Sequence, residues 1–332
     1  MTTVYVSCAE SREINVFSLA TSGEFQLVQR IPVDGAVQPL RISPDNQLLY
    51  AGSRGENAIH TYAIDPASGK LNPAGKISVL GSPTYLCCDR ARRVLIAAYY
   101  HDNALVTYPL DANGIPQSPC QTETALPRAH SAVLDASSRW LLVATLGADA
   151  LRCYQLGDDL RLTPAAPATI PVCAGSGPRH LAFAPDNRHL YCINELDGSI
   201  DRFDFDASNG QTQLRESTSL LPPGFAGAPW AAELRLVPDG RFLYASERRS
   251  STLATFAVDA ASGQLRLIGH CPTETQPRGM AIDPAGKWLI AAGQISGHVS
   301  VYELDGQTGL PQLRQRHATG LGPIGIEILR MS

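Results

Sequence analysis

Short apolar runs recur along the whole chain, and compact polar turns separate them. The runs at residues 48–51, 190–192 and 242–245 each follow a Pro-Asp-Asn or Pro-Asp-Gly turn. In such turns proline fixes its own φ angle, and Asp, Asn and Gly accept the remaining backbone angles. Apolar runs of this length between turns are typical of β-strands, and no segment of useful length has a helical period. The pattern predicts an all-β protein.

A second motif shows that the chain is a repeat. It consists of a small or polar residue, a proline and a variable residue that opens a strand. Copies stand at residues 38–40, 82–84, 177–179, 228–230, 276–278 and 322–324, and a degenerate copy at 128–130 fills the one wide gap. Successive copies are 44 to 51 residues apart, with a mean of about 47.

A third motif, an aspartate followed four residues later by a glycine, closes most of the repeats. It occurs at residues 65–69, 206–210, 259–263 and 305–309, between two segments that read as strands. Each repeat therefore holds about four short strands, and seven repeats account for nearly all 332 residues. Four-stranded units arranged around an axis form a β-propeller. We predict one domain over residues 1–332 that folds as a seven-bladed β-propeller.

The two ends of the chain complement each other. The last repeat ends soon after residues 322–328 and has room for one strand only. The first residues supply three more apolar segments, at 4–7, 14–17 and 25–28. A blade assembled from both ends would fasten the ring and remove its open edge. We expect the last blade to be closed by strands from both termini.

The charge balance argues against nucleic acid and membranes as partners. The chain has 27 Lys+Arg and 31 Asp+Glu, a net charge of −4, so it has no basic field for a nucleic-acid backbone. No apolar stretch approaches the roughly 18 residues that a membrane span needs. A hydrophobic content of 44% is enough to bury a large core, which excludes a disordered chain.

The eight cysteines show no metal-ligand spacing, and most lie in apolar runs as free thiols would. No His-x-His or His-x-x-x-His pair occurs either. The N-terminal segment has neither the basic nor the apolar region of a signal peptide. We therefore expect a cytoplasmic protein, a monomer or weak oligomer, that needs no cofactor and no metal.

Candidate chemistry gathers on one arc of the predicted ring. The residue after the proline of the second motif changes from blade to blade, and it is in turn Leu40, Thr84, His130, Arg179, Trp230, Arg278 and Ile324. If this position only packed against its neighbours, it would be small or apolar in every repeat. Four consecutive repeats instead carry His, Arg, Trp and Arg there. A second set of positions follows the next strand, and its ionisable members include Arg54, His101, Glu195 and Arg248. Since strands within a blade are antiparallel, both sets should open on one mouth of the central channel.

Arginines with a glutamate and a histidine at a channel mouth indicate a site for a small anionic ligand. A His or Glu there could accept a proton from water or from carbon. Other interpretations stay open. Arg179 and Glu195 could form a purely structural ion pair, and Trp230 could serve as wall packing. We expect His101, His180 and His189 to lie at the surface or behind the site.

Several segments resemble the cycloisomerase-2 or lactonase family of seven-bladed propellers. They are residues 175–186, 191–196, 230–233, 273–279 and 290–294, and the resemblance extends from Val4 to about Ile328. The most similar members are bacterial enzymes that hydrolyse 6-phosphoglucono-1,5-lactone to 6-phosphogluconate, a step of the oxidative pentose phosphate pathway, without a required metal. Fungal members instead cyclise carboxymuconate. Another sugar lactone, a carboxymuconate-type cycloisomerisation and a non-catalytic propeller scaffold remain alternatives.

The resemblance also implies site residues. A His, two Arg and a Glu act at the channel mouth of the cycloisomerases, and the matching positions are His130, Arg179 and Glu195, with the second arginine either Arg248 or Arg278. For a lactonase we expect Arg179 to stabilise the oxyanion, and Glu195 or His130 to take the proton of water. We expect Arg248 or Arg278 to hold the distal phosphate. Gln276 and Trp230 complete the predicted substrate-binding set.

Overall fold

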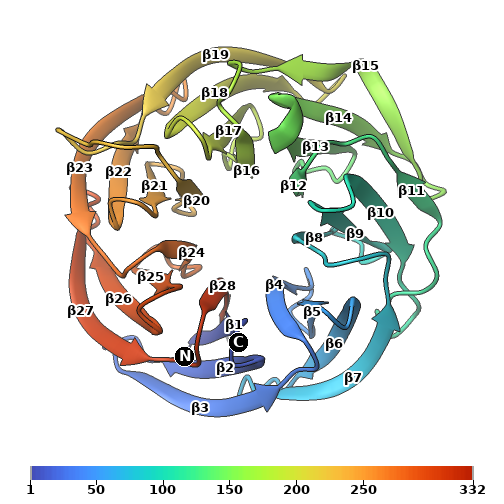
Figure 1. Cartoon of the computed structure of the whole chain (residues 1–332), viewed down its shortest axis with the longest axis horizontal. Helices are drawn as coiled ribbons and strands as arrows, with labels where there is room; N and C mark the ends of the chain where they lie inside the picture. Colours follow the sequence, from blue (N-terminus) through green and yellow to red (C-terminus); the bar gives the residue numbers. More distant parts are fainter. Residues whose placement is uncertain (1, 331–332) are drawn as a thin grey trace.

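The computed structural model describes residues 2–330, and almost all the regular secondary structure in this part of the chain is β-strand. The strands form seven four-stranded sheets around a central axis (Figure 1). Neighbouring strands within each sheet run antiparallel. The prediction of a seven-bladed β-propeller is confirmed. One short 3-10 turn, Leu146–Ala148, interrupts the all-strand pattern.

The blades are named here in chain order, each running from the channel to the outer rim. Blade 1 holds β4 (Ala36–Ile42), β5 (Leu48–Arg54), β6 (Ala58–Ile64) and β7 (Leu71–Ser78); blade 2 holds β8 (Tyr85–Cys88), β9 (Val94–Tyr99), β10 (Ala104–Pro109) and β11 (Gln121–Glu123). Blade 3 holds β12 (Ala129–Leu134), β13 (Trp140–Thr145), β14 (Ala150–Leu156) and β15 (Leu162–Pro171); blade 4 holds β16 (Pro178–Phe183), β17 (His189–Asn194), β18 (Ser199–Asp206) and β19 (Gln211–Ser219). Blade 5 holds β20 (Ala231–Leu236), β21 (Phe242–Glu247), β22 (Thr252–Val258) and β23 (Leu265–Pro272); blade 6 holds β24 (Pro277–Ile282), β25 (Trp288–Gly293), β26 (His298–Leu304) and β27 (Pro311–Ala318).

The closing blade takes strands from both ends of the chain. Its order is β28 (Pro323–Arg330), β1 (Thr2–Cys8), β2 (Glu13–Leu19) and β3 (Phe25–Pro32). Within it Val4 of β1 pairs with Phe17 of β2 on one side and with Ile328 of β28 on the other. In Figure 1 the blue β1 lies beside the red β28. The predicted closure from both termini is confirmed.

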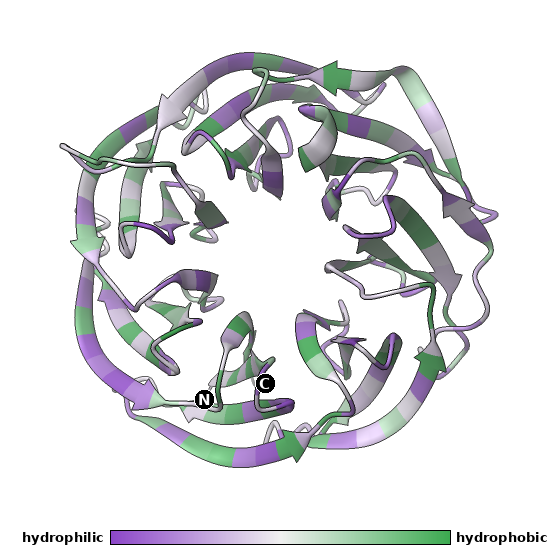
Figure 2. Cartoon of the chain, in the orientation of Figure 1, coloured by the Kyte–Doolittle hydropathy of each residue, from purple (hydrophilic) through white to green (hydrophobic). Residues whose placement is uncertain are grey.

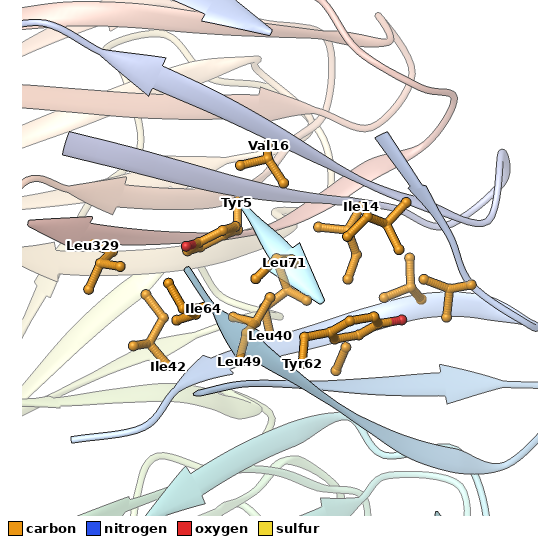
Figure 3. Close-up of a cluster of buried hydrophobic side chains, with 14 residues drawn as sticks. Tyr5, Ile14, Val16, Leu40, Ile42, Leu49, Tyr62, Ile64, Leu71 and Leu329 are labelled. Carbon is orange, nitrogen blue, oxygen red and sulfur yellow. The ribbon is translucent and has the colours of Figure 1, made fainter. Parts of the chain in front are cut away.

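The hydrophobic core lies between blades rather than within them. Seven clusters of buried side chains occur, and each draws its members from two neighbouring sheets. Figure 3 shows one of them, in which Tyr5 and Val16 of the closing blade pack against Leu49 and Ile64 of blade 1. A strand in the middle of a blade faces a neighbour on both sides, so it is apolar throughout rather than alternating.

Strands at the outer rim instead alternate between two kinds of side chain. In β19 the side chains alternate between exposed and half-buried, because one face lies against the neighbouring blades and the other faces solvent. The same alternation of polar and apolar residues follows the outer edge of the ring in Figure 2. In contrast, all six residues of β9 are buried.

A recurring hydrogen bond joins neighbouring blades. Tyr5, Tyr50, Tyr191 and Tyr244 each donate their hydroxyl to the carbonyl of a turn glycine in the next blade, at 2.5–2.8 Å. Three of the acceptors, Gly69, Gly263 and Gly309, end the Asp-led turn and have φ between +69° and +74°. A Cβ at Gly309 would meet the Phe242 ring at 2.4 Å, so glycine is needed for the angle and for the close contact.

Ring closure should be essential for folding. Deleting residues 1–19 removes β1 and β2, and with them the closing-blade side chains of two core clusters, including Tyr5, Val16 and Phe17. We expect the truncated chain to show no cooperative thermal unfolding transition by circular dichroism. As a control, Val16→Ala keeps every strand and should cost roughly 2 kcal/mol only. A truncated chain that melts cooperatively near the temperature of the intact protein would contradict the closure argument.

Candidate active site

Irregular register in the innermost strands aims polar side chains at the channel. In β16, Pro178 pairs with Asn194 and His180 with Ile193, so Arg179 has no partner across the ladder. His130 in β12 and Arg278 in β24 occupy the equivalent unpaired positions. Such a β-bulge bends the strand and re-aims the extra residue. In these three blades, the motif that opens the strand therefore also presents the site residue.

The loop before Arg179 is held by a single carboxylate. Asp149 accepts hydrogen bonds from the backbone N–H groups of Gly175 and Gly177, at 2.8 and 2.9 Å. Gly177 has φ of +66°, and a Cβ there would meet Leu196 at 2.7 Å. Glycine at this position therefore lets the chain turn tightly into the bulge of β16.

Glu195 stands at the junction of two blades. Its backbone N–H donates to the Gly177 carbonyl at 2.8 Å, and its own carbonyl accepts from Ala231 of blade 5 at 3.1 Å. The Oε2 atom receives Arg179 Nε and Arg248 Nη2, both at 2.8 Å. Both arginines are almost completely buried, and the Glu195 side chain is 15% exposed. The carboxylate is thus held between two guanidinium groups at the edge of the channel.

The remaining contacts of the two arginines fix their orientation. Arg179 Nη1 donates to the Ala232 carbonyl, while Arg248 donates to the carbonyls of Trp230 and Ala231 at 3.0 and 3.1 Å. The Arg248 guanidinium also lies 3.9 Å from the centroid of the Trp230 ring, a close cation–π contact. Trp230 is half-buried and lines the mouth, so it supports Arg248 and contacts the cavity at once.

A cavity of about 200 Å³ opens at this mouth. Six of the seven predicted site residues line it: His130, Arg179, Glu195, Trp230, Arg248 and Arg278. The seventh, Gln276, is not among the lining residues; its backbone carbonyl accepts a hydrogen bond from Gln294 instead, at 3.0 Å. Five further residues contribute to the wall, namely Gln38, Arg54, Thr84, Tyr100 and His101. Arg54, Thr84 and His101 belong to the two sets of positions that were predicted to open on this mouth, and His101 is exposed there.

His130 is a buried neutral base in a positive field. Its Nδ1 atom is buried and has no hydrogen-bond partner among the described residues. Burial, followed by the charge of Arg179, keeps the pKa of His130 well below its ordinary 6.5. The ring packs edge-on against His180 and Tyr100, with centroids 5.0 and 5.7 Å apart. The imidazole is therefore uncharged and held by aromatic contacts at neutral pH.

A second polar layer lies deeper in the channel. His180 was expected at the surface or behind the site, but its partners Glu233 and Arg235 were not selected from the sequence. His180 Nδ1 lies 2.8 Å from Glu233 Oε1, and Arg235 Nη1 donates to the same oxygen at 3.0 Å. Burial raises the pKa of Glu233 and lowers that of His180 well below its ordinary value. His180 and Glu233 line a smaller cavity, about 70 Å³, that shares His130 and Arg179 with the mouth. This layer forms the floor of the site.

Electrostatics distinguish the charged residues at the mouth. Burial alone would raise the pKa of Glu195, but Arg179 and Arg248 hold it below 4.5. Burial and the neighbouring Arg179 lower the pKa of Arg248 to about 9 and that of Arg278 to about 10, so both stay charged at neutral pH. The mouth therefore carries an excess of positive charge, which suits an anionic ligand.

The described part of the chain contains neither a grouped metal-binding site nor a membrane-spanning helix. Within residues 2–330, no group of three or more His, Cys, Asp or Glu side chains is arranged to hold a metal ion. The same residues include no helix long and apolar enough to cross a membrane.

Comparison with known proteins gives consistent matches along the chain. A family model described as lactonase, 7-bladed beta-propeller, matches residues 2–327. The 6-phosphogluconolactonase of Pectobacterium carotovorum is 40% identical over 328 residues, which are 99% of this chain and 98% of that protein. The enzyme of the same name from Erwinia tasmaniensis is 38% identical over the same shares.

Solved structures agree on the architecture. The periplasmic gluconolactonase of Pseudomonas aeruginosa superposes with a TM-score of 0.93 at 29% identity, covering 100% of this chain and 99% of that one. A protein of Lactobacillus plantarum superposes with a TM-score of 0.91 at 24% identity, covering 99% of both chains, and supports the fold alone.

The contacts of Glu195 with two arginines should make stability depend on pH in a defined direction. A carboxylate whose folded pKa is lowered stabilises the protein above its unfolded pKa, and this contribution is lost as the pH falls through the folded value. Glu195→Gln should cost about 3 kcal/mol at neutral pH, because it leaves two buried arginines without their counterion. The difference in Tm from wild type should shrink below pH 4.5, the ordinary value for this group.

Thermal unfolding monitored between pH 7 and pH 3 checks this expectation. The matched control is Glu24→Gln, which removes an exposed carboxylate and should leave Tm nearly unchanged at every pH. A destabilisation by Glu195→Gln that stays constant over the whole range would show that the charge of Glu195 does not contribute.

Proposed function

The chain belongs to the family of seven-bladed β-propeller lactonases, and from this membership we propose that it hydrolyses 6-phosphoglucono-1,5-lactone to 6-phosphogluconate. The observation that carries the proposal is the cavity at the channel mouth, which combines a neutral histidine, a carboxylate and several arginines within about 200 Å³. A sugar lactone with a phosphate needs a carbonyl-activating donor, a proton acceptor and an anion site, and the mouth offers all three kinds of group.

Arg179 is assigned to the lactone carbonyl. Its Nε and Nη1 groups are engaged by Glu195 and Ala232, and Nη2 makes no hydrogen bond within the described residues. Because the guanidinium is rigidly held by these two contacts, Nη2 is a preorganised donor for the oxyanion that forms when water attacks. Glu195 would act through this arginine and, with its Oε1 atom, could orient the attacking water.

His130 is assigned the role of general base. Arg179 and Arg248 stabilise the charged form of Glu195, which makes this carboxylate a weak base. The low basicity of His130 has a different origin, since burial and repulsion from arginine charges cause it. An anionic substrate and the developing oxyanion offset that repulsion, so the imidazole becomes a better proton acceptor as the reaction proceeds. The imidazolium can then return the proton to the departing ring oxygen.

The distal phosphate is assigned to Arg278 rather than Arg248. Arg248 is occupied by Glu195, two carbonyls and the Trp230 ring. Arg278 makes one long hydrogen bond within the described part of the chain, to Gln294 Oε1 at 3.4 Å. A guanidinium without a carboxylate partner is the better candidate for a phosphate.

The unphosphorylated lactone is a second candidate substrate. The Pseudomonas protein at 29% identity is named as a periplasmic gluconolactonase, and its fold superposes over the whole chain. Assays of glucono-1,5-lactone and of its 6-phosphate, followed by proton release, separate the two candidates.

The cysteines bear on where the protein acts. All eight are free, which supports the cytoplasm as the site of action. Cell fractionation tests this location.

Substitution at the carbonyl end should impair turnover of both lactones. Arg179→Met should lower kcat roughly 10²- to 10³-fold, since an oxyanion donor acts mainly in the transition state. His130→Asn should lower kcat roughly 10²- to 10⁴-fold if His130 is the base. Steady-state kinetics at mildly acidic pH, with circular dichroism to confirm folding, measure both effects. Near-normal turnover by both well-folded variants would refute the assignment.

Chelation should leave activity intact. We expect unchanged kcat and KM after EDTA treatment and gel filtration, because neither the sequence spacing nor the side-chain arrangement in residues 2–330 provides a ligand set. The comparison is made with the untreated protein in the same buffer. A loss of activity that added Mg²⁺ or Zn²⁺ restores would overturn the metal-free mechanism.

A further inference from the structure

The mouth holds more positive charge than its own carboxylate can balance. Four arginines and one glutamate line the cavity of about 200 Å³. Two of the arginines, Arg179 and Arg248, share Glu195. The other two, Arg54 and Arg278, have no carboxylate partner among the described residues. Burial and the neighbouring arginines disfavour the charged form of Arg278, so an anionic ligand beside it would be stabilising.

Arg54 and Arg278 come from different blades and meet at the same place. Arg54 is the last residue of β5 in blade 1, and Arg278 is the bulge residue of β24 in blade 6. The closing blade lies between these two blades, so only a closed ring brings them to one cavity. Their charges interact: Arg54 is one of the positive groups that lower the pKa of Arg278, after burial and Arg179.

A neighbour fixes the direction of Arg54. Its Nη2 group contacts His101 Nε2 across the boundary between blades 1 and 2. His101 also packs edge-on against Tyr100, with ring centroids 5.1 Å apart. Arg54 is exposed to solvent but is thus tethered to the wall of the cavity, which reduces the entropy that a ligand must remove on binding.

The cavity continues outward at this point. An adjoining groove of about 330 Å³ shares Gln38, Arg54 and Arg278 with the mouth. Glu10 and Arg12, which carry opposite charges, also line this groove. Arg54 and Arg278 are the charged residues that the groove and the mouth share, so the excess of positive charge is concentrated where the two join.

We propose that Arg54, with Arg278 and Gln38, forms the binding site for the phosphate of a phosphorylated sugar lactone and makes the enzyme selective for that substrate. The inference rests on the proposed function, because it requires the carbonyl to lie against Arg179 and His130. A lactone oriented in this way spans the mouth, with its phosphate toward the junction. Both guanidinium groups can then donate paired hydrogen bonds to phosphate oxygens.

The test compares two substrates and one inorganic probe. Arg54→Gln should reduce kcat/KM for 6-phosphoglucono-1,5-lactone roughly 10- to 100-fold, mostly through KM, because it removes charge-assisted hydrogen bonds to the phosphate. Hydrolysis of glucono-1,5-lactone should fall much less, because this substrate has no phosphate for Arg54 to bind. Arg54→Lys keeps the charge but loses the paired hydrogen bonds of the guanidinium group. Its kcat/KM for the phosphorylated lactone should therefore lie between those of wild type and Arg54→Gln. Inorganic phosphate, titrated by calorimetry, should bind more weakly to Arg54→Gln than to wild type.

Arg161→Gln is the matched control, because it removes an exposed arginine in the β14–β15 turn, outside the mouth. It should leave both activities and phosphate binding unchanged. Equal losses on both lactones, or no loss on either, would overturn the Arg54 site while leaving the lactonase function standing. If wild type hydrolyses neither lactone, the proposed function fails. In that case only the phosphate titration tests the Arg54 site. Weaker phosphate binding by Arg54→Gln supports the site, and unchanged binding overturns it.

Discussion

Contact between neighbouring blades is the constraint on which the rest of this structure depends. No blade has a core of its own, because each of the seven buried clusters draws side chains from two adjacent sheets. A sheet at an open end would expose one apolar face and an unpaired edge. The pairing of β1 with β28 removes that open end, and the tyrosine-to-glycine hydrogen bonds join a strand of one blade to a turn of the next. Closure also brings Arg54 and Arg278 to one cavity, so the site depends on it as well.

Within this rigid ring, the β-bulge turns a structural repeat into a functional one. A regular innermost strand would pair His130, Arg179 and Arg278 with the second strand of the blade. The register shift leaves each of them unpaired and directed at the channel. Because the scaffold around the bulge is repeated, the residue at that position can vary without disturbing the blade. This explains why the same position holds histidine in blade 3 and arginine in blades 4 and 6.

The fold could be predicted from the sequence because its signals are local. Turn motifs such as Pro44-Asp45-Asn46 specify their own geometry, and their regular spacing implies the ring. The ring of positions after the proline also identified His130, Arg179 and Arg278. The partners of these residues depend on side-chain orientation between blades, which spacing does not encode. Thus the second contact of Glu195, with Arg248, and the pairing of His180 with Glu233 emerged only from the structure, whereas an Arg179–Glu195 ion pair was already one of the interpretations of the sequence.

The positive charge that is proposed to bind an anion also sets the protonation state of the proposed base. His130 is neutral because burial and the surrounding arginines oppose its protonation. A histidine in that field is available to accept a proton but has little affinity for one. Binding a phosphate at the mouth would neutralise part of the field, and the oxyanion on the carbonyl would neutralise more. The basicity of His130 would therefore rise as negative charge enters the cavity. If His130 is the base, as proposed, the ligand's own charge would prepare it, and substrate recognition and proton transfer would depend on one set of arginines.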